Sequence, residues 1–272
     1  MNSTADNDET LLAQVAGVVE QAGQHLLAGF RTALAPKNLP DLLARIEAND
    51  AAVEATLRSA LLGLWPGSQW AADEEEEGAL PAGEWWVADP AEGNVNHVHG
   101  RAGWGVTATL VRDGEPMLTA IAIPLTGETY TAFVGRGAFV NGQSLRVSAK
   151  QSLDAATVAS GQASPGESKA IRSKMLRSAD ALLDAALLVS LSVPTRLELV
   201  DVAAGRLDAF WQHGRVRAGL IGGALLVREA GGLVTDLSGS HWSAASPDFL
   251  ASPPALQSAI LAALSSTSEY VA

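Results

Sequence analysis

The chain of 272 residues is rich in apolar side chains and strongly acidic, with 30 acidic against 18 basic residues, a formal net charge of −12 and a hydrophobic fraction of 47%. This composition indicates a folded globular protein, and the acidic balance argues against a nucleic-acid-binding surface, which needs clustered Lys and Arg. Because there is no cysteine, disulfides, thiolate metal sites and cysteine nucleophiles are excluded. The N-terminus lacks a signal-peptide pattern and no apolar run reaches the ~18 residues of a membrane span, so we expect a cytoplasmic protein that does not enter the membrane.

Two amphipathic helices are predicted at the start of the chain, over residues 10–31 and 49–64, because apolar residues recur there at helical spacing. Between them, the prolines at positions 36 and 40 predict a turn, and Asp50 falls in the first turn of the second helix. The acidic run 73–77 follows. A solvated loop is the ordinary interpretation of such a run, with one or two of its carboxylates kept as candidate cation ligands.

A buried strand is expected at residues 85–88, followed by a turn at residues 89–93 that carries the carboxylates of Asp89 and Glu92. Pro90 fixes φ in this turn and Gly93 permits a close approach of the backbone. Two carboxylates held so close together would repel unless a cation neutralised them. The pattern therefore predicts either a divalent metal or a basic partner opposite the turn.

The rest of the chain changes character near residue 148. Residues 105–142 contain four strand-like segments, at 105–111, 117–123, 129–133 and 138–140, punctuated by Asp-Gly, Thr-Gly and Asn-Gly turn signals, which predicts an antiparallel meander. Beyond residue 148, strands at 157–160, 187–193 and 233–235 alternate with helices at 167–183, 195–204, 217–230 and 254–264. We therefore expect an α+β half at 1–148 and an α/β half at 149–272 within one compact unit.

The order of these segments resembles that of the inositol monophosphatase family, the magnesium-dependent, lithium-sensitive phosphatases. The family motif D-P-hydrophobic-D-G-T-T-N-F-x-H-G is matched by the following residues: Asp89, Pro90, Gly93, Asn96, His99 and Gly100. LVRDGEP, GRGAFVNGQSLRVS, VAAGRLDAFW, GALLVREAGGLVTD and FLASPPAL resemble further blocks in the family order. The resemblance implies a layered αβαβα sandwich, Mg²⁺ as cofactor, a small phosphorylated metabolite as substrate and a homodimer.

The resemblance also assigns a first metal site and a catalytic pair. The metal would be held by Asp89, by the Ala91 carbonyl and by Glu74 of the acidic run, with Asp73 or Glu75 as alternatives in register. Asp50 matches a family Asp near the site. Glu74 and Asn94 occupy the positions that orient the attacking water, although an amide cannot relay a proton as the family's Thr hydroxyl can.

Five departures from the family pattern fall on this one pocket. Glu92 replaces an Asp, Gly219 stands where the second metal's distant Asp would be, and Asn94 replaces the Thr. Gln212 and Pro194 alter positions that contact substrate, so that the substrate-binding set becomes Gly93, Asn94, Gln212 and Pro194. The second metal site is thus disrupted.

Two functions remain open from the sequence. One is a retuned phosphatase with a single strong magnesium site and weak or absent activity on inositol phosphates. The other is a catalytically inactive member retained for binding a ligand or a protein. Arg215 and Arg217 either enter the space of the second metal or face solvent, and His97 and His213 are either catalytic or structural, the structural role being the ordinary one.

Overall fold

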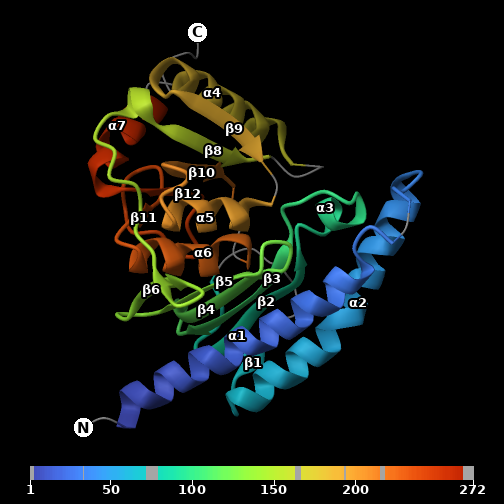
Figure 1. Ribbon diagram of the computed structural model, residues 1–272. Coiled ribbons are helices and arrows are strands. Elements are labelled where there is room, and N and C mark those ends of the chain that lie inside the picture. Colours follow the sequence, from blue (N-terminus) through green and yellow to red (C-terminus); the bar gives the residue numbers. More distant parts are fainter. Residues whose placement is uncertain are drawn as a thin grey trace.

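The computed structural model describes residues 3–32, 34–71, 79–162, 167–192, 194–214 and 218–265. Its helices are α1 (Ser3–Gly29), α2 (Leu39–Leu64), α3 (Asn94–Val98), α4 (Lys169–Ala185), α5 (Thr195–Ala203), α6 (Ala218–Glu229) and α7 (Pro254–Ser265). Figure 1 shows five layers: α1 with α2, a first sheet, α5 with α6, a second sheet, and α4 with α7. The expected layered αβαβα architecture is confirmed.

The first sheet has seven strands in sequence order and contains the predicted meander. Its strands are β1 (Gln69–Trp70), β2 (Glu84–Glu92), β3 (Gly105–Arg112), β4 (Glu115–Ile123), β5 (Glu128–Phe133), β6 (Gly137–Val140) and β7 (Gln143–Ser144). All neighbours are antiparallel except β1 and β2. Helices α1 and α2 cover one face, and α6 packs on the other.

Small residues allow α6 to lie close to this sheet. A Cβ atom on Gly222 would come within 2.5 Å of Thr109 Oγ1 and 2.7 Å of Thr119 Oγ1. The two buried threonine hydroxyls are 2.9 Å apart and hydrogen-bond to each other, which satisfies both polar groups inside the core. On the opposite face, Trp86 is fully buried in the core cluster beneath α1 and α2, where a side chain of this kind contributes about 1.5–3 kcal/mol or more.

The second sheet has five strands in the order β11-β12-β10-β8-β9. Their bounds are β8 (Thr157–Gly161), β9 (Leu188–Ser192), β10 (Ala209–His213), β11 (Leu233–Thr235) and β12 (Asp248–Ser252). The boundary expected at residues 148/149 lies between β7 and β8. Two of these strands, β10 and β12, were not predicted as strands. Both are short runs that are buried on both faces, and such runs carry no period that separates a buried strand from a helix.

Helix α2 begins ten residues earlier than predicted. Asn38 Oδ1 accepts the backbone N–H of Asp41 at 3.0 Å and caps the helix, and Pro40 lies in its first turn. The predicted turn at residues 36–40 is present at its start, with bends at residues 37–38, but the helix already begins at Leu39. Proline is tolerated in the first helical turn, where the N–H groups have no intrahelical partner. Asp50 consequently lies in the middle of α2. Within the described part of the chain, each helix is too short or too polar to cross a bilayer.

Candidate functional site

The two carboxylates of the predicted turn lie at the irregular end of β2. Asp89 pairs with Thr107 of β3, whereas Glu92 pairs with Gly105, so the register shifts by one residue between them. This bulge accommodates Pro90, which cannot donate to a strand ladder, and the Ala91 N–H bonds Asp89 Oδ1 at 2.9 Å. Both carboxylates are buried, Asp89 being 9% and Glu92 6% exposed. The residues expected to form a turn thus extend the strand, and the chain turns at Gly93.

Gly93, in the N-terminal half of the chain, contacts the C-terminal half at this turn. Its φ of 74° lies in the left-handed region, and it caps α3. A Cβ atom here would come within 2.4 Å of the Gly103 carbonyl oxygen and 2.9 Å of Pro194 Cγ. Pro194, the residue preceding α5, therefore lies directly against Gly93, so that two of the predicted substrate-binding residues meet.

Both side-chain amide hydrogens of Asn94 form hydrogen bonds to residues of α2. Its Nδ2 donates to Asp50 Oδ1 at 2.8 Å and to the Ile46 carbonyl at 3.1 Å, while its Oδ1 accepts from Asn49 Nδ2 at 2.7 Å. A carboxamide has only two N–H donors. Asn94 therefore lies beside the predicted metal-binding turn but has no side-chain N–H left for a water molecule.

Asp50 is held beside Asp89 by this network. Burial, reinforced by the Asp89 charge, raises the pKa of Asp50 to about 6, while the hydrogen bond from Asn94 opposes that rise and Glu54 adds to it. Neighbouring carboxylates repel when both are ionised, so the Asp89 charge disfavours the charged form of Asp50. The pair gives this region the negative character that a cation would neutralise.

His97 completes the network and uses both ring nitrogens for structure. Nδ1 lies 2.9 Å from Asn49 Nδ2, and Nε2 lies 3.0 Å from the Leu26 carbonyl oxygen. Because the carbonyl only accepts and the amide nitrogen only donates, Nε2 carries the proton and Nδ1 accepts. The ring also packs edge-on against Trp104. His97 thus ties α3 to α1 and α2.

Asn49 is the member of this network that the sequence did not reveal. Its Nδ2 donates to both Asn94 and His97, so it links the turn to the helix. In the sequence, the signal that could have identified Asn49 as a site residue was its position next to Asp50. The distance of more than forty residues to Asn94 concealed the contact.

The end of β10 carries the other predicted polar residues. Gln212 is buried, and its Oε1 accepts no hydrogen bond from the described residues. His213 Nε2 lies 2.6 Å from Ser178 Oγ of α4. Burial, together with the charges of Lys174 and Arg177, lowers the pKa of His213 to about 4, so this histidine is neutral near pH 7. No described contact joins Gln212 to the Asp89 turn.

The described residues alone do not complete a magnesium site. Asp89, Glu92 and Asp50 supply hard oxygen donors, but no group of three or more metal-ligating side chains within the described ranges could hold an ion. Gly219, in the first turn of α6, has no carboxylate to contribute to such a site. The candidates Asp73, Glu74 and Glu75 and the arginines Arg215 and Arg217 lie outside the described residues.

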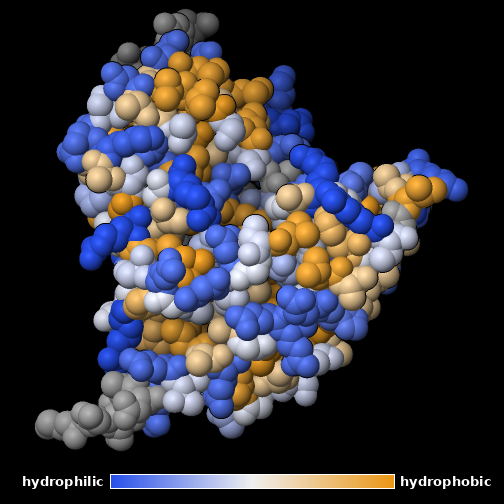
Figure 2. All heavy atoms as spheres, in the orientation of Figure 1, coloured by the Kyte–Doolittle hydropathy of each residue, from blue (hydrophilic) through white to orange (hydrophobic). Residues whose placement is uncertain are grey.

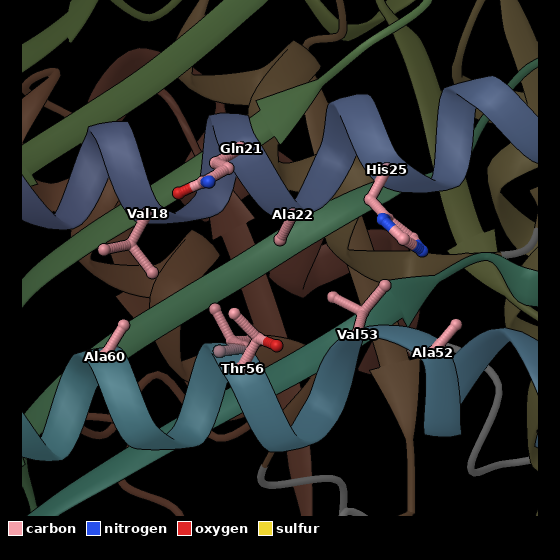
Figure 3. A pocket seen from close by; sticks show the side chains of 9 residues that line it. Val18, Gln21, Ala22, His25, Ala52, Val53, Thr56 and Ala60 are labelled. Carbon is pink, nitrogen blue, oxygen red and sulfur yellow. The ribbon is translucent and has the colours of Figure 1, made fainter.

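A separate small cavity of about 130 Å³ lies between α1 and α2. In Figure 3, Val18, Gln21, Ala22 and His25 of α1 face Ala52, Val53, Thr56 and Ala60 of α2 across it. Most of this lining is apolar, and it includes none of the predicted site residues. The cavity is a gap in helix packing rather than part of the candidate site.

Comparison with known proteins gives one consistent family. The model described as the inositol monophosphatase family matches residues 7–269. The chain is 34% identical to the Nus factor SuhB of Pseudomonas aeruginosa over 195 residues, 71% of this chain and 72% of that protein. It is 30% identical to inositol monophosphatase 2 of Solanum lycopersicum over 256 residues, 90% of this chain and 94% of that protein.

Solved structures agree with this architecture. The extragenic suppressor protein SuhB of Bartonella henselae superposes with a TM-score of 0.76 at 27% identity, covering 94% of this chain and 98% of its own. An inositol monophosphatase from Anabaena (Nostoc) sp. PCC 7120 gives a TM-score of 0.77 over 96% and 97% of the two chains. At 22% identity, the latter supports the fold alone.

Proposed function

Because the chain belongs to the inositol monophosphatase family, we propose that it is a divergent phosphatase that hydrolyses a small phosphorylated metabolite, with weak or absent activity on inositol phosphates. The observation that supports this most is the burial of Asp89 and Glu92 at the end of β2, with Asp50 held beside Asp89. Burying like charges together is costly unless a cation, a basic side chain or hydrogen bonds offset the cost. A bound divalent cation would offset the mutual repulsion of these carboxylates.

Members of this family generally depend on magnesium, and we propose one strong Mg²⁺ site here. Asp89 and the Ala91 carbonyl, joined by Glu74 or its neighbours Asp73 and Glu75, would hold it. When bound, such an ion neutralises phosphate charge and lowers the pKa of a bound water. The Ala91 N–H orients the Asp89 carboxylate from within the same turn.

The substrate-facing residues in this proposal are neutral. Gly93 and Pro194 lie in contact, and in this proposal they would lie against the substrate. The buried Gln212 Oε1 has no hydrogen-bond partner among the described residues, and in this proposal it would accept a hydrogen bond from a substrate hydroxyl. An uncharged acceptor at this position suits a ligand that carries its negative charge on the phosphate alone.

A phosphate-release assay with sugar, inositol and nucleotide monophosphates at millimolar magnesium tests the proposal, beside a calorimetric titration with Mg²⁺. We expect turnover of at least one small phosphomonoester and one binding event, both lost in Asp89→Asn. Gln24→Asn, on the exposed side of α1, is the control and should behave as wild type. If neither turnover nor metal binding is found in the wild type, the enzyme proposal is wrong.

The second candidate function is that of a non-catalytic member that binds a ligand or a protein. It is favoured by Asn94, whose amide hydrogens are both engaged with α2, and by Gly219 at the place expected for an acid. Several relatives carry the name Nus factor, as does the Pseudomonas aeruginosa protein. A folded wild type that neither releases phosphate nor binds Mg²⁺ would support this candidate.

We further propose that the protein is cytoplasmic and homodimeric, as the family resemblance implied. Neither statement depends on whether catalysis survives.

A further inference from the structure

A groove of about 470 Å³ runs between the first half of α1 and the strands β5 and β6 of the first sheet. Figure 1 shows α1 crossing this sheet, and Figure 2 shows hydrophobic surface among hydrophilic side chains above the N-terminal half of the helix. The floor of the groove is apolar, with Leu12 and Ala16 of α1 on one side and Phe133 and Phe139 of the sheet on the other. A cavity of this size can hold a small organic molecule.

Carboxylates stand at both ends of this apolar floor. Asp8, Leu12, Ala16 and Glu20 follow one another at intervals of four residues, so they share one face of α1. The stripe is acidic at each end and apolar in the middle, and Glu9 lines the groove beside Asp8. At a rise of about 1.5 Å per residue, the two acidic ends are about 18 Å apart along the helix. This arrangement fits an elongated ligand better than a compact ion.

The groove continues past Glu20. A second hollow of about 490 Å³ is lined by Glu20 and Thr129, which also line the first, and by Glu128 at the start of β5. Glu128 Oε2 accepts a hydrogen bond from Thr126 Oγ1 at 2.8 Å, which holds this carboxylate at the turn before the strand. One carboxylate from the helix and one from the sheet therefore line the same hollow, where both would attract an ammonium group.

The carboxylates are the polar groups of the groove that a ligand would meet. The amide of Asn141 is already engaged, since its Oδ1 accepts the Thr129 N–H at 2.8 Å and its Nδ2 donates to the Gly127 carbonyl at 3.0 Å. Glu9 and Glu20, by contrast, form no ion pair or side-chain hydrogen bond with another described residue. Their charges are therefore open to a cation.

Arg136 is the one basic side chain among the described residues that line the groove, and it already has a partner. Its guanidinium lies 3.4 Å from Asp8 Oδ2. The turn that carries it is fixed, because the N–H groups of Gly135 and Gly137 both donate to the Glu229 carboxylate at 2.8 Å. Arg136 thus neutralises Asp8 and leaves the groove with a net negative charge. This balance disfavours an anionic ligand and favours a cationic one.

We infer that this groove, defined by Glu9, Leu12, Ala16, Glu20, Glu128 and Phe139, binds a linear aliphatic polyamine. Its terminal ammonium groups would pair with Glu9 at one end and with Glu20 and Glu128 at the other, while the methylene chain covers the apolar floor. A monoamine would reach one end alone, and a compact divalent ion would gain nothing from the floor. The inference does not depend on the phosphatase proposal, since none of these residues belongs to the candidate site.

Isothermal titration calorimetry of the full chain with spermine, at low ionic strength and without divalent metal, measures the binding. We expect one spermine per chain, and butylamine, which carries a single ammonium group, should bind at least ~10-fold more weakly. Glu9→Gln/Glu20→Gln should weaken spermine binding roughly 10-fold, because an exposed ion pair is lost at each end. Glu47→Gln/Asp180→Asn is the matched control, since it removes the same charge from exposed positions on α2 and α4 and should bind as wild type.

Removing the basic side chain tests the charge of the groove from the other direction. Arg136→Gln frees Asp8, so it should bind spermine roughly 3-fold more tightly than wild type. Lys169→Gln, which removes the same charge from an exposed position on α4, is its control and should bind as wild type. Asp89→Asn should also bind spermine as wild type, because the groove is separate from the carboxylates of β2. Circular dichroism verifies the fold of each variant.

Several results would overturn the inference. One is a wild type that does not bind spermine, and another is an equal affinity for butylamine, which would mean that the two ends do not act together. Equal losses in the two double variants, or equal gains in Arg136→Gln and Lys169→Gln, would show that spermine responds to the net charge alone. Loss of binding in Asp89→Asn would place the amine at the end of β2 instead. Because these titrations contain neither magnesium nor a phosphate ester, their outcome is distinct from that of the phosphatase assay.

Discussion

Asn94 donates a hydrogen bond to Asp50 Oδ1 across 2.8 Å, and this contact joins the turn after β2 to the middle of α2. The same amide reaches the Ile46 carbonyl, and its oxygen accepts from Asn49. Asn94 stands at the position of a water-orienting Thr in the family, but here its side chain forms a structural bridge, the set of hydrogen bonds between the turn and α2. The bridge also fixes the place of a carboxyl group whose pKa is raised toward neutrality.

Replacing Asn94 by Ala should lower the free energy of unfolding by about 1–3 kcal/mol, because partly buried partners on α2 would lose their hydrogen bonds. Urea denaturation followed by circular dichroism measures this change. Gln24→Ala, which truncates an exposed amide on α1, is the control and should stay within about 0.5 kcal/mol of wild type. If Asn94→Ala is as stable as the control, water satisfies the hydrogen-bonding groups on α2 equally well, and the Asn94 hydrogen bonds do not add to the free energy of unfolding.

Asp50 should make the fold less stable as the pH rises. Its pKa is raised from 3.8 in the unfolded chain to about 6 in the folded one, so folding favours the protonated form. The stabilisation is fully present below pH 4 and is lost as the pH rises through about 6. Asp50→Asn, which keeps an oxygen for Asn94, should match wild type at pH 4 and exceed it in stability at pH 7.

Thermal unfolding in buffers free of divalent metal, from pH 4 to pH 8, tests the Asp50 prediction. Glu47→Gln is the control, because Glu47 is an exposed carboxylate one turn away on the same helix. Its stability relative to wild type should not vary in this way. A difference between Asp50→Asn and wild type that does not depend on pH would contradict the expected linkage.

Gly93→Ala should destabilise the protein more than a change at another glycine of the same backbone class. Positive φ alone costs about 1–2 kcal/mol for alanine, and a Cβ at position 93 would also collide with the Gly103 carbonyl and with Pro194. Gly114→Ala isolates the first effect, since Gly114 has a φ of 86° but open space around it. We expect Gly93→Ala to exceed Gly114→Ala by about 1–3 kcal/mol in chemical denaturation. Equal losses would show that Pro194 can move away freely.

The double change Glu92→Asp/Gly219→Asp should raise the affinity for magnesium by restoring the carboxylates of the family's second site. Isothermal titration calorimetry with Mg²⁺ measures the affinity and the number of sites. Glu92→Asp/Gly17→Asp adds the same charge on α1, where Gly17 has open space around it, and should bind as the Glu92→Asp single variant does. If the double variant folds but binds no more tightly than this control, position 219 is not where the lost ligand stood.

Much of the layered fold was predictable because each layer has its own pattern. The apolar period of α1, the Gly-containing turns of the meander and the alternating segments beyond residue 148 are local signals. The start of α2 was not predicted, since Pro40 belongs equally well to a turn or to a first helical turn, and only Asn38 and its bond to the Asp41 N–H decide between them. Strands β10 and β12 were not predicted, because burial on both faces removes the alternation of apolar and polar residues that indicates a strand.

The sequence by itself determined the family, the order of the layers and the identity of the residues around Asp89, because these follow from local patterns and from motifs in register. Only the tertiary structure decided what those residues contact. Asn94 turns toward Asp50, His97 toward Leu26 and Asn49, and Pro194 against Gly93. Such pairings join residues 44 to 101 positions apart, and they depend on how α2 and α5 pack onto the sheets, which no local pattern specifies.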